Sequence, residues 1–254
     1  YYDAADQAGL SRLYGGIHIQ ADDLVGRRLG SRIGFDAFRK AHGLRYGALA
    51  EPKLVNLSTR AKTGTGAATN IAGFVTRTTG ETLLRGVGPT LGNFGVTGFE
   101  PDPNIKLYAA GATDPMASNE DWQTDAAAIR DASTRLGAFA LGENSRDAAM
   151  VSTLAAGAYT FATSGASATN GIILAEVYNR DLVNLSTRTA VGNGDEVAIA
   201  GFVIDSPRAG TVMVRGAGPA PSTFGVTDAH TDPKTNLGRH LTGDGGETVA
   251  TKHD

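Results

Sequence analysis

An internal repeat limits what this chain can fold into more than any other feature of its sequence. The heptapeptide Leu-Val-Asn-Leu-Ser-Thr-Arg occurs at residues 54–60 and returns unchanged at residues 182–188. The pentapeptide Ile-Ala-Gly-Phe-Val occurs at 71–75 and again at 199–203, with the same offset of 128 residues. Matches in the same order at a nearly constant offset indicate that a unit of domain length has been duplicated.

The repeat continues beyond these two peptides after a two-residue insertion. The further matching pairs are Arg85–Pro89 with Arg215–Pro219, Phe94–Thr97 with Phe224–Thr227, and Asp102-Pro103 with Asp232-Pro233. At Asp254 the second copy has reached the equivalent of about Asp121, so we expect the second copy to be incomplete.

Within the first copy, short β-branched or apolar runs alternate with glycine-rich turns, as in an antiparallel β-sandwich. The expected strands are Leu54–Thr59, Ile71–Thr76, Thr82–Val87, Ile105–Ala109, Ala148–Leu154, Ala158–Thr163 and Gly171–Tyr178, with one helical turn at Ala126–Ala132. We therefore predict one β-sandwich repeat at residues 54–181 and a partial one at 182–254. High glycine content, at 34 residues, and a low charged fraction of 19% suit such a turn-rich β protein.

The residues before the repeat have a different, helical pattern. Helix-forming residues run from Asp3 to Leu13 and stop at Gly15-Gly16, and a second apolar stripe runs from Asp22 to about His42. Gly43 is the expected stop of this second helix. The predicted fold class is therefore mixed: a short helical remnant of a bundle domain at 1–43, a linker at 44–53, and then mainly β structure.

Charge and composition exclude several classes of partner. A formal net charge of -3 provides no basic field for nucleic acid. There is no run of eighteen apolar residues that could span a bilayer. The absence of cysteine excludes disulfides and thiolate metal sites.

One motif in the helical segment carries chemistry. It reads Ser11-Arg12, then five residues, His18, then three residues, Asp22. The pattern resembles the last signature motif of the vanadium-dependent haloperoxidases and of their relatives, the type 2 phosphatidic acid phosphatases. The flanking residues 13–18 and 23–30 are more similar to the haloperoxidase branch. A phosphatase of the same superfamily is the alternative.

This resemblance implies an oxyanion site that holds vanadate as cofactor, with phosphate as a competitor. Arg12 would hold two anionic oxygens through its planar fork of donors, beside Ser11 and the turn Gly15–Gly16. His18 would be the vanadium ligand, or the nucleophile in a phosphatase, and Asp22 would fix its tautomer. The substrates of the complete enzyme would be the small molecules peroxide and halide.

The sequence departs from the family in one decisive respect. Family members also contain a lysine-arginine motif and a Pro-Ser-Gly-His motif, but no Pro-Ser-Gly-His occurs here and no lysine precedes Lys40. We expect those parts to precede Tyr1 in a longer parent enzyme. The 254-residue chain alone should then bind vanadate weakly and catalyse nothing measurable.

The β region resembles a second kind of protein. Residues 154–160 followed by 170–178 are similar to the end of the β-sandwich modules appended to secreted bacterial enzymes and surface proteins. That resemblance implies an extracellular or periplasmic location and names no ligand. It also leaves a non-enzymatic alternative, in which the sandwich array serves adhesion or surface attachment.

Three weaker candidate sites lie in the repeats. Residues 119–121, and Asp228 with His230 and Asp232, have side chains that bind cations but lack the spacing of a known metal loop. Gly86 and Gly88 are spaced as in a phosphate loop, but they lead into Pro89 without Gly-Lys-Ser/Thr, so a simple turn is the better interpretation.

Overall fold

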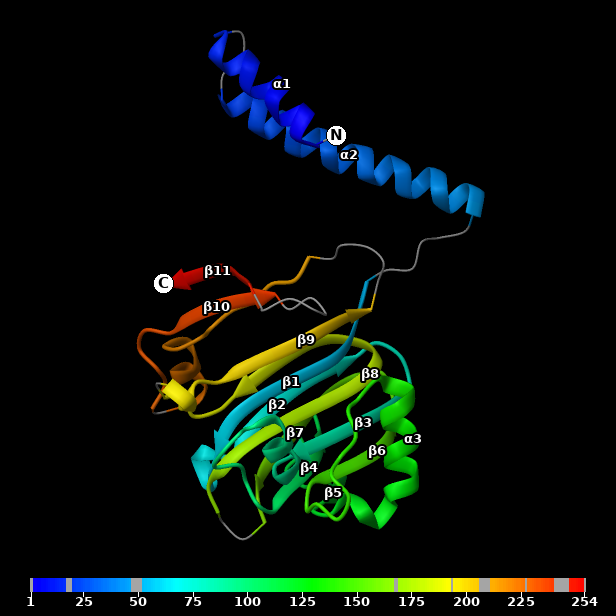
Figure 1. The fold of residues 1–254 in the computed structure, drawn as a ribbon, viewed down its shortest axis with the longest axis vertical. Helices are drawn as coiled ribbons and strands as arrows, with labels where there is room; N and C mark the ends of the chain where they lie inside the picture. Colours follow the sequence, from blue (N-terminus) through cyan, green and yellow to red (C-terminus); the bar gives the residue numbers. More distant parts are fainter. Residues whose placement is uncertain are drawn as a thin grey trace. The chain divides into compact units, whose positions relative to one another are not determined.

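Two N-terminal helices precede a mostly antiparallel β structure, as the sequence pattern predicts (Figure 1). The computed structural model describes residues 2–16, 20–46, 52–166, 169–192, 194–205, 211–226, 228–239 and 247–253. The chain divides into two compact units, Tyr1–Arg208 and Ala209–Asp254.

The helical segment consists of α1 (Tyr2–Tyr14) and α2 (Gln20–Tyr46). The predicted end of α2 at Gly43 is wrong, because the helix continues through this glycine to Tyr46. A glycine inside a helix costs only about 1 kcal/mol relative to alanine, and Leu44 and Arg45 are good helix formers. None of the helices in the described ranges is both long and apolar enough for a membrane span.

Nine strands form one sheet that folds into two layers. They are β1 (Lys53–Thr63), β2 (Asn70–Thr76), β3 (Gly80–Val87), β4 (Pro103–Ala109), β5 (Ala117–Asn119), β6 (Ala148–Leu154), β7 (Gly157–Gly165), β8 (Gly171–Arg188) and β9 (Ile199–Asp205). Each expected strand of the first copy is present, and the predicted helical turn is α3 (Ala126–Leu136).

Strand β8 belongs to both layers. Its first half pairs with β1 on one side and with β3 on the other, and β3 in turn pairs with β6. From Leu182 onward β8 pairs instead with β2, which leads through β7 and β4 to β5. The predicted division between the repeats, at 181/182, therefore falls inside one continuous strand. That division into two sandwich domains stays a prediction.

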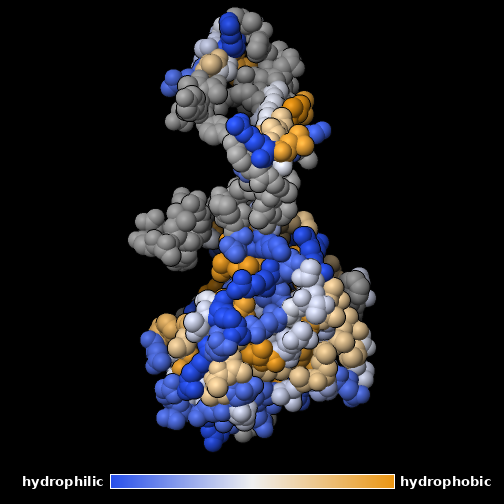
Figure 2. All heavy atoms as spheres, turned by 90° about the vertical axis from the view of Figure 1, so that its right-hand side faces the viewer, coloured by the Kyte–Doolittle hydropathy of each residue, from blue (hydrophilic) through white to orange (hydrophobic). Residues whose placement is uncertain are grey.

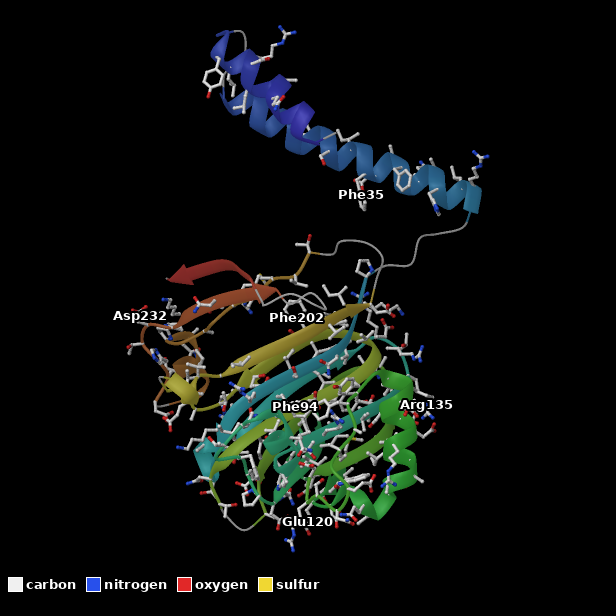
Figure 3. The ribbon with its side chains drawn as sticks, in the orientation of Figure 1. Phe35, Phe94, Glu120, Arg135, Phe202 and Asp232 are labelled. Carbon is white, nitrogen blue, oxygen red and sulfur yellow. The ribbon has the colours of Figure 1, made fainter. Side chains whose placement is uncertain are left out.

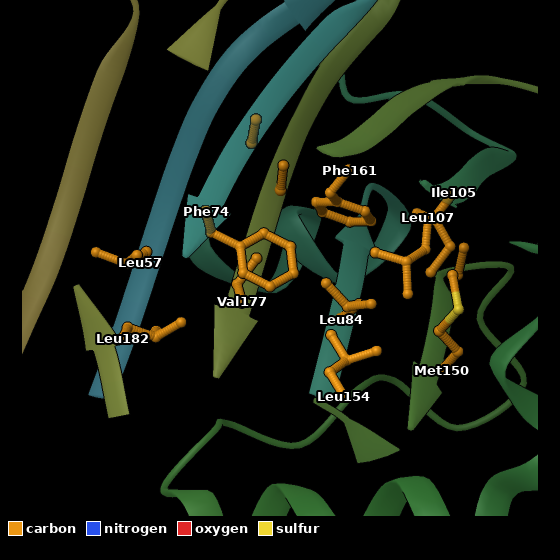
Figure 4. Packing of buried hydrophobic residues seen from close by; sticks show 13 residues of the cluster. Leu57, Phe74, Leu84, Ile105, Leu107, Met150, Leu154, Phe161, Val177 and Leu182 are labelled. Atoms are coloured by element: carbon orange, nitrogen blue, oxygen red, sulfur yellow. The ribbon is translucent and has the colours of Figure 1, made fainter. Parts of the chain in front are cut away.

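The main hydrophobic core lies between the two layers and draws side chains from strands of both (Figure 4). Its largest fully buried members include Phe74, Leu84 and Phe161. Alternate residues of β3 and β8 point the other way, into a second cluster formed with Trp122 and Ile129. Helix α3 covers this second face, so β3 and the first half of β8 are buried on both sides.

The two repeated peptides do not pair within their own copies. The heptapeptide at 54–60 pairs with the second pentapeptide, with Arg60 opposite Ile199 and Leu57 opposite Phe202. The heptapeptide at 182–188 pairs with the first pentapeptide, with Arg188 opposite Ile71. Each copy thus supplies the neighbouring strand for the other.

The second compact unit contains η5 (Ala220–Phe224) and the antiparallel pair β10 (Lys234–Arg239) and β11 (Glu247–His253). Its glycine turn has the geometry of the first copy. A Cβ at Gly218 would clash with the carbonyl oxygen of His230, as a Cβ at Gly88 would clash with that of Glu100. The repeated glycines are therefore required by close backbone approach.

Candidate functional site

The predicted oxyanion motif lies where α1 ends and α2 begins. Ser11 and Arg12 are in the last turns of α1 and both are exposed. Asp22 is in the first turn of α2. His18 lies outside the described residues, so the structure does not test whether Arg12, His18 and Asp22 meet at one surface.

Hydrogen bonds account for the two glycines of the motif. The backbone N–H of Gly15 donates to the carbonyl oxygen of Ser11 at 3.0 Å, and that of Gly16 donates to Leu13 at 3.0 Å. Gly16 has a φ of 66°, the left-handed conformation that glycine adopts without strain. The Ser11 hydroxyl donates to the Ala8 carbonyl at 2.8 Å, so it is held against its own helix.

The electrostatics of this turn suit a bound anion only in part. The C-terminal end of α1 exposes carbonyl oxygens, which repel an anion and attract a cation such as Arg12. The N-terminal end of α2 exposes N–H groups, which favour an anion. A guanidinium at the end of α1 can therefore complement the helix dipole, hold an oxyanion, or do both.

Sequence reasoning missed a buried ion pair that joins β3 to β8. Arg85 is fully buried, and its Nε donates to Oε2 of Glu176 at 2.8 Å. Its Nη2 donates to the same oxygen, and its Nη1 donates to the Phe139 carbonyl at 2.6 Å. The Phe139 ring stacks on the guanidinium, with 4.1 Å between its centroid and Cζ of Arg85. Each of the three guanidinium nitrogens of Arg85 thus donates to a protein group.

Tyr178 completes this network from β8. Its hydroxyl donates to Oε1 of Glu176 at 2.8 Å, so both carboxylate oxygens have donors. Burial, with the adjacent Glu176 carboxylate, raises the pKa of the Tyr178 phenol. The ion pair and the Tyr178 hydroxyl together bond both oxygens of the Glu176 carboxylate, so the cluster holds β3 and β8 together. An arginine inside the apolar run Thr82–Val87 was the sequence signal for such a partner.

A second buried carboxylate, Asp147, organises the glycine turn. Its Oδ1 accepts the backbone N–H of Gly88 at 2.7 Å and that of Thr90 at 3.3 Å. Its Oδ2 accepts the hydroxyls of Ser145, at 2.6 Å, and of Thr90. The amides that a phosphate loop would offer to a ligand are therefore taken by Asp147. The turn leads into η2 (Pro89–Phe94), in agreement with a structural interpretation of these glycines.

The two weaker cation candidates act as local hydrogen-bonding groups. Asp121 accepts the backbone N–H of Gln123 at 2.9 Å, and Glu120 accepts from Asn104 at 3.3 Å. In the second unit, Nδ1 of His230 accepts the backbone N–H of Asp232 at 3.2 Å. Over the part of the chain that the structure describes, no three metal-binding side chains gather. Figure 3 labels Glu120 and Asp232 at these two places.

Comparison with known proteins gives one finding, and it concerns the helical segment. Residues 1–47 match a family model described as the VCPO second helical-bundle domain, a domain of vanadium haloperoxidases. The match spans less than a fifth of the 254 residues. No curated protein and no solved structure matches the chain.

We expect Arg85→Met to lower the free energy of unfolding by about 3–5 kcal/mol, because it leaves the Glu176 carboxylate buried without its cation. Replacing both partners, in Arg85→Met/Glu176→Leu, should recover most of that loss. Urea denaturation of the single and double variants measures the coupling. A double variant that loses the full sum of the two single losses would contradict a buried pair.

Tyr178 should make the protein less stable at alkaline pH. Because the folded-state pKa of its phenol is raised, only the unfolded chain releases that proton as the pH rises past about 10, so the free energy of unfolding falls. Tyr178→Phe should remove this part of the alkaline loss. Urea denaturation at several pH values tests this, with Tyr108→Phe as the control for losing a tyrosine. An identical pH dependence in Tyr178→Phe and in the unmodified chain would refute the assignment.

Proposed function

We propose that residues 1–47 are part of the vanadate-binding helical domain of a haloperoxidase-like enzyme, and that the β structure is an appended module. The observation that carries this proposal is a coincidence of position. The family-model match covers the residues that contain the Ser11-Arg12, His18 and Asp22 motif, which resembles the haloperoxidase motif in its residue types, its spacing and its flanking residues.

The described part of the motif fits an oxyanion cofactor. Arg12 presents an exposed guanidinium, whose forked donors match the oxygens of vanadate or phosphate. The turn at Gly16 has no side chain to obstruct a close approach. In the proposal, His18 is the vanadium ligand and Asp22 holds the imidazole in the correct tautomer. Vanadate, when bound, supplies the activation of peroxide that oxidises a halide.

The exposed face of α2 is consistent with a bundle. Large apolar side chains on this helix are exposed, including Ile33 at 59%, Phe38 at 59% and Leu44 at 82%. Figure 2 shows such hydrophobic side chains gathered on the helical segment, and Figure 3 shows Phe35 projecting from α2. An isolated surface helix rarely carries so many, whereas a bundle helix buries them against its neighbours.

The acid–base chemistry of the reaction needs a group that this sequence does not contain. Pro-Ser-Gly-His, whose histidine acts as acid or base in the related enzymes, is absent from the 254 residues. We therefore expect the chain by itself to bind vanadate without oxidising halide. A phosphatase of the same superfamily would use the same anion site, with phosphate in place of vanadate.

A second candidate function rests on the β region, which makes up most of the chain. The nine-stranded sheet of this region contains the buried carboxylates Glu176 and Asp147, and both are bonded to groups of the fold itself. Such a unit suits attachment or adhesion better than catalysis. A location outside the cytoplasm belongs to the same proposal and rests on the similarity to modules of secreted bacterial proteins.

Vanadate binding tests the enzyme proposal directly. Arg12→Ala should weaken vanadate binding by about 10- to 150-fold, because it removes charge-assisted hydrogen bonds of about 1.5–3 kcal/mol. His18→Ala should weaken it as well. Titration followed by vanadium NMR measures the affinity, and inorganic phosphate should compete.

Lys40→Ala is the matched control, because Lys40 is another exposed cation of the helical segment. Its affinity should equal that of the unmodified chain, and circular dichroism should show the same helix content in all variants. Equal affinities for Arg12→Ala and Lys40→Ala would overturn the site.

A further inference from the structure

The two repeats exchange strands in the same register. Ser58 lies opposite Gly201 in the pairing of β1 with β9, and Ser186 lies opposite Gly73 in the pairing of β8 with β2. Ser58 and Ser186 are 128 residues apart, and so are Gly73 and Gly201, so the two pairs join equivalent positions of the repeats. Even the register shift is repeated, between Leu54 and Asn56 in one pairing and between Val75 and Thr76 in the other.

Side-chain contacts follow the same symmetry. A Cβ at Gly201 would lie 2.7 Å from the Ser58 hydroxyl, and a Cβ at Gly73 would lie 2.8 Å from the Ser186 hydroxyl. At the centre, the equivalent hydroxyls of Thr59 and Thr187 bond to each other at 2.7 Å. A residue that meets its own equivalent marks the axis of a two-fold interface.

The loops that follow the exchanged strands are alike as well. The backbone N–H of Gly64 donates to the Ala68 carbonyl, and that of Gly192 donates to the Glu196 carbonyl, each at 2.9 Å. Gly66 and Gly194 have left-handed φ values of 59° and 61°. In both repeats the same turn follows the heptapeptide strand. In neither repeat does this turn pair the heptapeptide with the pentapeptide of the same repeat.

From this symmetry we propose that β1 is an exchangeable strand through which two copies of this chain dock. In the dimer, β1 of one chain lies between β8 and β9 of the other chain. The segment Gly64–Thr69 acts as the hinge. The partner is a second copy because it presents the same β8 and β9 with the same register, so every strand pairing of the monomer is reproduced. This proposal does not depend on the function of the helical segment.

The energetics set the conditions for exchange. Strand β1 is central in its layer, and Leu57, Thr59 and Ala61 are at most 2% exposed, so it cannot leave the folded sheet cheaply. Exchange should therefore occur while the chain folds, when β1 is still free. In the monomer, β1 is tethered to its own β8 and β9 at an effective concentration in the millimolar range. Pairing between chains must compete with this tether, so the dimer fraction should increase with protein concentration.

One ion pair breaks the symmetry and occurs only in the pairing of β1 with the second repeat. Lys62, near the end of β1, bonds to Glu196 at 2.6 Å, whereas the equivalent positions are Ala190 and Ala68. The bond lowers the pKa of the Glu196 carboxyl. Because both groups are exposed, the pair contributes little stability. The pair nevertheless forms only when β1 lies beside the turn that contains Glu196 in the second repeat.

Single cysteines in this cysteine-free chain detect the exchange. One full-length chain carries Ser58→Cys, and another, with a tag of different size, carries Gly201→Cys. The two are refolded together from denaturant at low and at high concentration and then oxidised. Paired Cα partners in a ladder are close enough for a disulfide. The double variant Ser58→Cys/Gly201→Cys, refolded dilute, should form the bond within one chain.

We expect a disulfide-linked heterodimer that grows with protein concentration and exceeds, by at least tenfold, the amount formed by Ser58→Cys mixed with Gly73→Cys. Gly73 is the matched control because it occupies the equivalent position in the other copy. An intrachain bond without any concentration-dependent heterodimer overturns the proposal. So does absence of the intrachain bond, or preferential linkage to the Gly73 position.

Discussion

The sheet depends on one strand, β8, which pairs with β1 and β3 in one layer and with β2 in the other. Because its residues change partners at Leu182, the two layers are joined by covalent backbone as well as by the core between them. The same strand carries Val177 into that core and Tyr178 into the second cluster. A strand buried on both faces must satisfy any polar side chain internally, and this requirement explains the polar clusters of the fold.

Two buried carboxylates meet that requirement in different ways. Glu176 neutralises Arg85 and accepts from Tyr178, which fixes β3 against β8. Asp147 instead accepts backbone N–H groups, which shapes the turn after β3 and leaves no amide there for a ligand. In these two clusters the buried carboxylates thus stabilise the fold. The motif that we propose to bind an anion lies in the helical segment, where Arg12 is exposed.

Local sequence signals predicted the elements well and their partners poorly. Alternating patterns predicted the strands of the first copy and Gly15-Gly16 predicted the end of α1, because these depend on neighbouring residues. Gly43 was wrong as a helix stop, because a helix tolerates one glycine when good helix formers follow. The partner of Arg85 lies 91 residues away, and no local pattern identifies it. The repeat predicted a duplication, but identical heptapeptides cannot reveal which pentapeptide each will pair with. His18 of the predicted site lies outside the described residues, so its role stays a prediction.

Pairing across the repeats is the central claim, because it makes two sequence copies into one sheet and supports exchange between chains. Backbone nuclear Overhauser effects test it in the unmodified, folded protein. We expect contacts between Leu57 and Phe202 and between Leu185 and Phe74, with none between the backbones of Leu57 and Phe74. Contacts between the backbones of Leu57 and Phe74, with Leu185 opposite Phe202, would show that each copy pairs with itself and would contradict the account.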